Sequence, residues 1–148
     1  GTNRWLLMKP SISEILEHCS KQSGTNAKVE VLLKYQSEPL KAILYYTLDP
    51  RPVFNLPKGA PPYKPNEFPD QHGRLYTEVR KIHMFLTNGG NPNLHPIKRE
   101  QLFIQMLEGV DPKDAQLLIG MKDKKLPYKG ITANVVNTAF PGLIADKE

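Results

Sequence analysis

Apolar residues in the first third of the chain recur every three or four positions, a spacing that predicts short amphipathic helices. One such stripe lies within residues 10–22 and consists of Ile12, Ile15, Leu16 and Cys19. A second lies within residues 27–36, with Asn26 as the expected N-cap, and consists of Val29, Leu32, Leu33 and Gln36. Pro39 then opens a third helix, Leu40 to Leu48, whose stripe is Leu40, Ile43, Leu44 and Thr47. Three helices are therefore expected before residue 49.

The helical pattern breaks between Asp49 and Gly73, where seven prolines fall within twenty residues. Proline lacks the backbone N–H that a helix needs, so this segment is expected to be a long loop. Apolar residues nevertheless punctuate it, namely Val53, Phe54, Leu56, Tyr63 and Phe68. Because long loops in compact domains are usually functional or disordered, these residues favour a loop that packs on the rest of the protein.

Four more helices are expected in the second half, each with its own boundary signals. Residues Arg74 to Asn88 carry the stripe Leu75, Val79, Ile82 and Leu86, and Gly89-Gly90 is the expected stop. Pro96 opens a helix to about Gly109 that buries Phe103, Met106, Leu107 and Val110. Asp111-Pro112 opens the next, to about Met121, with Ala115, Leu118 and Ile119 on its buried face.

The last predicted helix is Ala133 to Phe140, capped by Thr132 and ended by Pro141-Gly142. No alternation typical of strands extends over more than a few residues, and no internal repeat is visible. The predicted fold class is therefore all-α, an irregular bundle of about seven helices with a long proline-rich loop. A chain of 148 residues fits one domain, which we assign to residues 3–148.

Composition narrows the range of partners. Twenty Lys and Arg against fifteen Asp and Glu leave a net charge of +5, an excess that favours polyanions such as nucleic acid. Cys19 is the single cysteine, so no internal disulfide can form, and its place on an apolar stripe predicts a buried structural thiol. No apolar run reaches the length of a membrane span. We therefore expect no membrane partner and a cytoplasmic location.

The usual catalytic patterns are missing from the sequence. The four histidines, His18, His72, His83 and His95, do not occur at metal-binding spacings, and neither phosphate-loop nor dinucleotide motifs are present. Acidic residues are scattered over helix faces, which leaves a carboxylate pair open without supporting one. We expect a non-catalytic protein with no metal and no cofactor; a nuclease or hydrolase that uses scattered carboxylates is the least favoured alternative.

The segment from Lys122 to Asn137 is the strongest candidate for binding. Four lysines, Lys122, Lys124, Lys125 and Lys129, precede the expected N-terminus of the last helix. Free N–H groups, the Thr132 hydroxyl and the helix dipole at that end suit a phosphate. The same residues also fit a simpler interpretation, in which the lysines complement the dipole at the end of the preceding helix and Thr132 is an ordinary cap. Residue patterns alone leave the two interpretations balanced.

Residues Leu117 to Ile144 combine an apolar pair, a basic tract ending in glycine, a hydroxyl residue, a short apolar helix and Phe140-Pro141-Gly142-Leu143-Ile144. This stretch resembles the end of the helical N-terminal DNA-binding domain of bacteriophage ATP-dependent DNA ligases, although the tract between Asp123 and Gly130 is a few residues longer. The resemblance implies contacts to the duplex backbone. The K-x-D-G adenylation motif of ligases is absent from the sequence.

The whole chain also resembles an uncharacterised family of small proteins from tailed phages, including cyanophages, through Trp5 to Leu16 and Pro61 to Asn66. From these observations we expect a phage protein that binds double-stranded DNA through the phosphate backbone with low sequence specificity, in replication, repair or transcription. The alternative is an adaptor that binds a phage or host protein, such as a replication or transcription protein, through the proline-rich loop. The predicted nucleic-acid-binding residues are Lys122, Lys124, Lys125, Lys129, Gly130, Thr132, Asn134 and Asn137.

Overall fold

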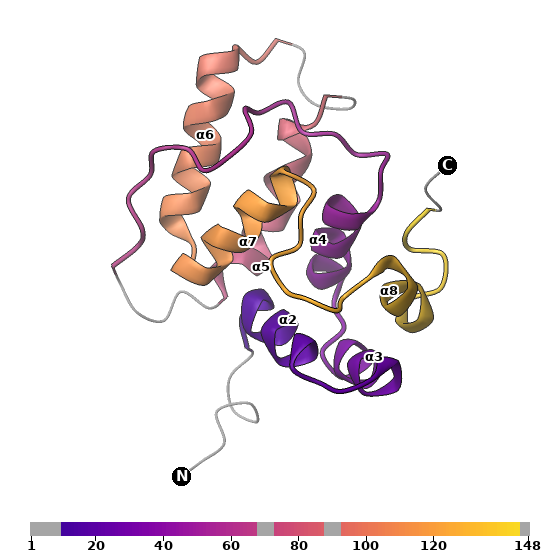
Figure 1. The fold of residues 1–148 in the computed structure, drawn as a ribbon. Helices are drawn as coiled ribbons and strands as arrows, with labels where there is room; N and C mark the ends of the chain where they lie inside the picture. The colour runs from indigo at the N-terminus through magenta and orange to yellow at the C-terminus, as the bar shows by residue number, and fades with distance from the viewer. Residues whose placement is uncertain (1–9, 68–72, 88–92, 146–148) are drawn as a thin grey trace.

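The computed structural model describes residues 10–67, 73–87 and 93–145, and these residues form an all-α fold (Figure 1). The α-helices are α2 (Ile12–Ser20), α3 (Thr25–Lys34), α4 (Glu38–Leu48), α5 (Arg74–Glu78), α6 (Pro96–Gly109), α7 (Pro112–Lys122) and α8 (Ala133–Ala139). A 3₁₀ helix, η1 (Val79–Phe85), continues α5 directly. The predicted fold class is confirmed. None of the described helices is both long and apolar enough to cross a membrane.

Local capping explains why the first helices begin where they do. The Ser11 hydroxyl accepts the Glu14 N–H while the Glu14 carboxylate accepts the Ser11 N–H, a reciprocal capping box at the start of α2. The Ser37 hydroxyl likewise caps α4, because it accepts the N–H of Leu40. The predicted stripes of both helices are buried in one core. Cys19 is fully buried in it, and burial raises the pKa of its thiol to about 11, as expected for a structural cysteine.

The prediction for α3 was wrong in two details. The helix begins at Thr25 after Gly24, whose φ of +85° suits glycine, so Asn26 lies inside the first turn and is not the cap. Its buried face is formed by Val31 and Leu32, whereas Leu33 is 41% exposed. This face packs between α2 and α8, the two helices that α3 contacts most.

The helix predicted over residues 74–88 is shorter and changes type. It is α-helical only through Glu78, tightens to the 3₁₀ helix η1 and ends at Phe85. Leu86 is extended and pairs with Phe54 in an isolated antiparallel bridge, with the Asn55 N–H donating to the Phe85 carbonyl at 2.7 Å. This long-range pairing ends the helix before Gly89-Gly90, which lie outside the described residues.

The proline-rich segment packs on the body, as expected. Pro52 and Phe54 are buried and Leu56 and Tyr63 are partly buried, whereas Val53 is 52% exposed and so does not anchor the loop. Phe68 lies outside the described residues. In Figure 1 the segment crosses in front of α6 and passes close to α7. It therefore forms part of the same surface as the link that follows α7.

The final three helices match their predicted starts. α6 and α7 carry Pro96 and Pro112 in their first turns, and the side chains of His95 and Asp111 accept N–H groups of those turns. Thr132 caps α8 by accepting the Val135 N–H at 3.3 Å, as the sequence predicted. In α7 the inward face includes Leu117 as well as the expected Ala115 and Leu118, while Ile119 is only partly buried.

Candidate functional site

The basic segment begins at the last residue of α7 and leads to α8, and its four lysines divide into two groups. Lys122 and Lys124 direct their ammonium groups into the protein. Lys125 and Lys129 are exposed, and in the part of the chain that the structure describes they carry no ion pair and no side-chain hydrogen bond. The segment therefore does not act as one uniform lysine patch.

Lys122 is an internal anchor. Its side chain is 2% exposed, and its Nζ donates to the carbonyls of Pro57 and Gly59, each at 2.8 Å, and to Oδ1 of Asp123 at 2.7 Å. An ammonium group has three protons, and these three acceptors use all of them. The prediction that Lys122 contacts a phosphate is corrected, because in this fold it binds the proline-rich segment instead.

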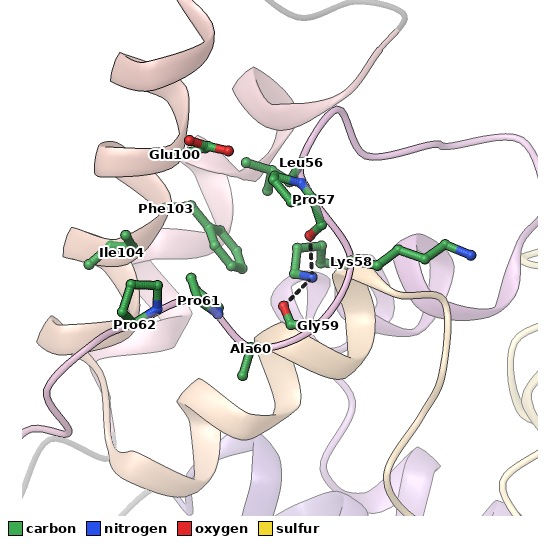
Figure 2. A pocket seen from close by; sticks show the side chains of 11 residues that line it. Leu56, Pro57, Lys58, Gly59, Ala60, Pro61, Pro62, Glu100, Phe103 and Ile104 are labelled. Atoms are coloured by element: carbon green, nitrogen blue, oxygen red, sulfur yellow. Dashed lines mark hydrogen bonds between the residues drawn. The ribbon is translucent and has the colours of Figure 1, made fainter.

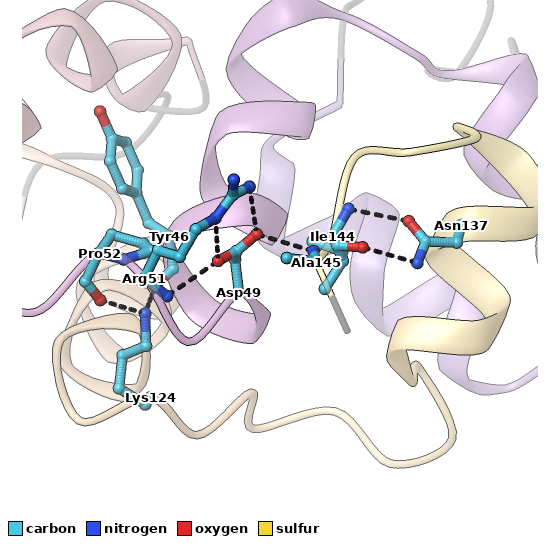
Figure 3. A network of polar contacts seen from close by, with 8 residues as sticks. All are labelled: Tyr46, Asp49, Arg51, Pro52, Lys124, Asn137, Ile144 and Ala145. Atoms are coloured by element: carbon cyan, nitrogen blue, oxygen red, sulfur yellow. Dashed lines mark hydrogen bonds and ion pairs between the residues drawn. The ribbon is translucent and has the colours of Figure 1, made fainter. Parts of the chain in front are cut away.

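Lys124 is a second anchor, shown in Figure 3. Its Nζ donates to the carbonyls of Tyr46 and Pro52, both at 2.6 Å, and its backbone φ is +61°, which turns the chain sharply after α7. Burial lowers the pKa of Lys124 to about 8, against the opposing effect of the Asp49 carboxylate. Lys124 therefore has a structural role that the sequence did not indicate, and its contact with a phosphate stays a prediction.

Asp49 forms the centre of a polar network that the sequence did not reveal (Figure 3). Its buried carboxylate accepts two bonds from the Arg51 guanidinium, at 2.9 and 2.8 Å, and one from the Ala145 N–H at 2.8 Å. The Arg51 hydrogen bonds lower the pKa of Asp49 to about 2. This network ties the end of α4 to the segment that follows α8. The acidic residue directly after a helix gave no sequence signal for a partner almost a hundred positions away.

Asn137 is likewise used inside the protein. Its amide oxygen accepts the Ile144 N–H at 2.8 Å and its amide nitrogen donates to the Ile144 carbonyl at 2.9 Å. These two bonds close the turn after α8, where the adjacent Phe140 and Ile144 are buried. Asn137 is therefore a turn-forming residue in this fold, and its role in nucleic-acid binding stays a prediction.

Five of the predicted residues remain on the surface: Lys125, Lys129, Gly130, Thr132 and Asn134. Gly130 has a φ of +82°, and a β-carbon there would lie 2.9 Å from Cε of Lys28, so the Lys28 side chain lies beside this turn. The Lys28 Nζ donates to the Gln22 carbonyl at 2.7 Å. The Thr132 hydroxyl serves as a helix cap, which agrees with the simpler interpretation of that residue.

A half-open hollow of about 360 Å³ lies between the proline-rich segment and α6 (Figure 2). Phe103 and Ile104 of α6 face Pro61 and Pro62 across it. Leu56 completes the mainly apolar lining, and Glu100 and the anchor Lys122 contribute polar groups. The sequence predicted Phe103 as core and Pro61-Pro62 as loop, but nothing in it indicated that they face each other.

No three His, Cys, Asp or Glu side chains of residues 10–67, 73–87 and 93–145 gather in a group that could hold a metal ion. The features that the site does offer are the exposed lysines and the apolar hollow.

Comparison with known proteins places the chain in one family. Residues 15–128 match the family described as "Family of unknown function (DUF6433)", and because the match covers most of the chain, the protein belongs to that family. The matched range includes the anchors Lys122 and Lys124 and the exposed Lys125, and it ends before Lys129. No curated protein matches the chain. Because the function of the family is unknown, the resemblance to ligase DNA-binding domains stays a prediction.

Proposed function

We propose that this chain is a non-catalytic phage protein that binds double-stranded DNA through the phosphate backbone, with little sequence specificity, in replication, repair or transcription. The observation that carries the proposal is the exposed turn from Lys125 to Asn134. The anchors Lys122 and Lys124 precede it and the Asn137 bonds follow it, so the backbone of the turn is held before any ligand binds. A turn that is already ordered loses less entropy on binding than a flexible one.

Electrostatics supports the same surface. Lys125 and Lys129 face solvent with free ammonium groups, and Lys28 lies beside Gly130. Elsewhere in the described residues several surface cations are already paired with carboxylates, for example Lys21 with Glu17 and Lys81 with Glu78. Phosphate oxygens accept hydrogen bonds from lysine ammonium groups and from backbone N–H groups. Unpaired lysines beside the exposed backbone at Gly130 therefore suit a phosphate. Such contacts read shape and charge and carry no direct sequence information.

The test is binding of random duplex DNA over a range of salt concentrations. Each lysine–phosphate contact releases about one counterion, so log affinity should fall linearly with log salt concentration. Replacing Lys125 and Lys129 together with Ala should weaken binding and reduce the slope by up to about two. The control replaces Lys81 and Lys98, on η1 and α6, with the same loss of charge, and should change binding much less. Absence of binding at low salt, or equal effects of the two double variants, would contradict the proposal.

A second function is supported by the hollow beside α6. We propose as the alternative that the chain is an adaptor whose proline-rich segment and α6 bind a phage or host protein. Its carrying observation is the apolar lining by Phe103, Ile104 and the prolines, because a concave apolar surface suits an inserted apolar side chain.

Point substitutions test the adaptor hypothesis without deleting the proline-rich segment, which also contributes Phe54 to the core. Ile104→Glu should abolish co-purification of a stable partner, whereas Ile97→Glu, on the same helix but 60% exposed away from the hollow, should retain it. A partner captured equally by both variants binds elsewhere. In that case the adaptor function does not involve the hollow.

A further inference from the structure

The proline-rich segment has few backbone N–H groups with which it could hold its own fold. Pro57, Pro61 and Pro62 have no N–H, so this stretch can donate few backbone hydrogen bonds. In the described part of the chain, residues 56–63 form hydrogen bonds only with Lys122 and Asp123. This part of the segment therefore depends on side chains that come from the end of α7, whereas the residues that flank it are bonded elsewhere, Asn55 to Phe85 and Lys64 to Glu108.

Three consecutive residues supply these contacts. Lys122 donates to the Pro57 and Gly59 carbonyls, the Asp123 carboxylate accepts the Gly59 N–H at 3.0 Å, and Lys124 donates to the Pro52 carbonyl. The Lys122–Asp123 ion pair, at 2.7 Å, keeps both side chains aligned on the same loop residue. The Pro57 and Gly59 carbonyls both accept from Nζ of Lys122, and the dashed lines in Figure 2 mark these two hydrogen bonds.

We infer that Lys122, Asp123 and Lys124 form a latch that closes the proline-rich segment over α6 and α7, so that the hollow and the basic turn are ordered together. The three latch residues lie directly between the two surfaces. Lys122 lines the hollow, and the backbone that follows Lys124 leads into Lys125. When the latch is released, Pro57 and Gly59 lose their hydrogen bonds and the neighbouring turn loses the contacts that hold its start, whereas the bridge between Phe54 and Leu86 remains. This inference concerns the protein without ligand and does not rest on what either surface binds.

Amide hydrogen exchange, measured by mass spectrometry on the whole chain, tests the latch from its own side. Lys122→Met should speed exchange of the Gly59 amide, read in peptides covering residues 53–63, by about tenfold or more. The Pro57 and Gly59 carbonyls lose their donor, and Asp123, which accepts the Gly59 N–H, loses the cation that holds it in place. Asp123→Ala is a milder second variant and should act in the same direction on the Gly59 amide. Lys125→Met removes a neighbouring lysine that makes no internal bond, and should leave this exchange unchanged.

A substitution in the proline-rich segment tests whether the hollow and the basic turn are ordered together. Phe54→Ala removes a buried anchor of the proline-rich segment and leaves residues 122–124 intact, so exchange in peptides covering residues 123–130 should also become faster. Val53→Ala, at an exposed neighbouring position, is the control. Peptides from α2 report global unfolding, and the effects are compared with theirs. Unchanged exchange at 53–63 in Lys122→Met, or at 123–130 in Phe54→Ala, would overturn the inference.

Discussion

Residues 122–124 and residues 125–134 are neighbours in the chain and both are rich in polar groups, yet they relate to the core in opposite ways. In the first stretch two lysines point inward and bind backbone carbonyls of the proline-rich segment and of α4. In the second, Lys125, Lys129, Gly130, Thr132 and Asn134 are all exposed. The difference teaches that a lysine beside a segment poor in donors is recruited as a donor, while a lysine beside a well-capped helix stays free.

This contrast also changes how charge contributes to binding. Only a lysine whose ammonium group remains hydrated can release counterions from DNA, so the inner lysines add to the net charge without adding contacts. Their contribution to the proposed DNA surface is to hold its edge in place. The outer lysines, Lys125 and Lys129, should determine the affinity for DNA. The inner lysines, Lys122 and Lys124, should determine how well the turn is ordered.

The largest expected effect follows from removing the inner anchor. Lys122→Met leaves the carbonyls of Pro57 and Gly59 without a donor and Asp123 without its cation, so the free energy of unfolding should fall by about 3 kcal/mol. Lys125→Met should change it by less than about 0.5 kcal/mol, as expected for an exposed side chain. Urea unfolding of both variants measures the difference. Equal stabilities would break the distinction between the two stretches.

A somewhat smaller effect is expected at Gly120, where α7 meets the chain that returns from it. A β-carbon there would collide with the Lys125 carbonyl oxygen and lie 3.0 Å from Cδ of Pro127. Gly120→Ala should therefore destabilise the protein by about 2 kcal/mol, although alanine normally favours a helix. Gly109→Ala is the matched control, because its nearest neighbour would be the flexible Arg74 side chain at 3.5 Å. Thermal unfolding of the pair should show a lower Tm for Gly120→Ala alone.

The pH dependence of stability gives a third comparison. Lys124 has a pKa lowered to about 8 by burial, from 10.5, so above pH 8 the unfolded chain binds more protons at this residue than the folded protein. Its contribution to the free energy of unfolding should then rise with pH between about 8 and 9. Above about pH 9 the buried Cys19 acts in the opposite direction, because the folded thiol keeps its proton to about pH 11.

Urea unfolding at a series of pH values from about 7.5 to 9 isolates this contribution. Lys124→Met should remove the upward slope, whereas Lys129→Met, which replaces an exposed lysine of the same segment, should preserve it. A slope that is identical in both variants would show that Lys124 does not lose its proton in the folded protein over this range.

The smallest effect on stability belongs to the outer stretch. Replacing Lys125 and Lys129 together with Ala should change the free energy of unfolding by less than about 1 kcal/mol, because neither side chain has an internal partner. The same variant should show the largest loss of DNA affinity. A variant that loses stability and affinity together would make the outer lysines structural, like the inner ones.

Prediction from sequence succeeded where the physical cause was local. Thr132 and Asp111 were identified as caps because a side chain bonds an N–H two or three residues away. The stripes of α2 and α4 were correct for the same reason, since helical periodicity is visible in a few turns. Asn26 failed because Gly24, with its positive φ, starts α3 two residues earlier.

Prediction failed where the partner lies far away in the chain. The carbonyl acceptors of Lys122 and Lys124 are 63 to 78 residues distant, and no spacing rule connects a lysine with a carbonyl at such separations. The early end of η1 has the same origin, since Leu86 leaves the helix to pair with Phe54. The hollow could not be predicted either, because it exists only where α6 and the proline-rich segment meet.

By itself, therefore, the sequence determined the all-α class, most helix boundaries and the position of the basic segment, because caps, prolines and apolar spacing act within a few residues. Only the tertiary structure decided which lysines of that segment are free. The choice depends on whether an unpaired carbonyl is within reach of each ammonium group, and that distance is set by the packing of the proline-rich segment against α4, α6 and α7.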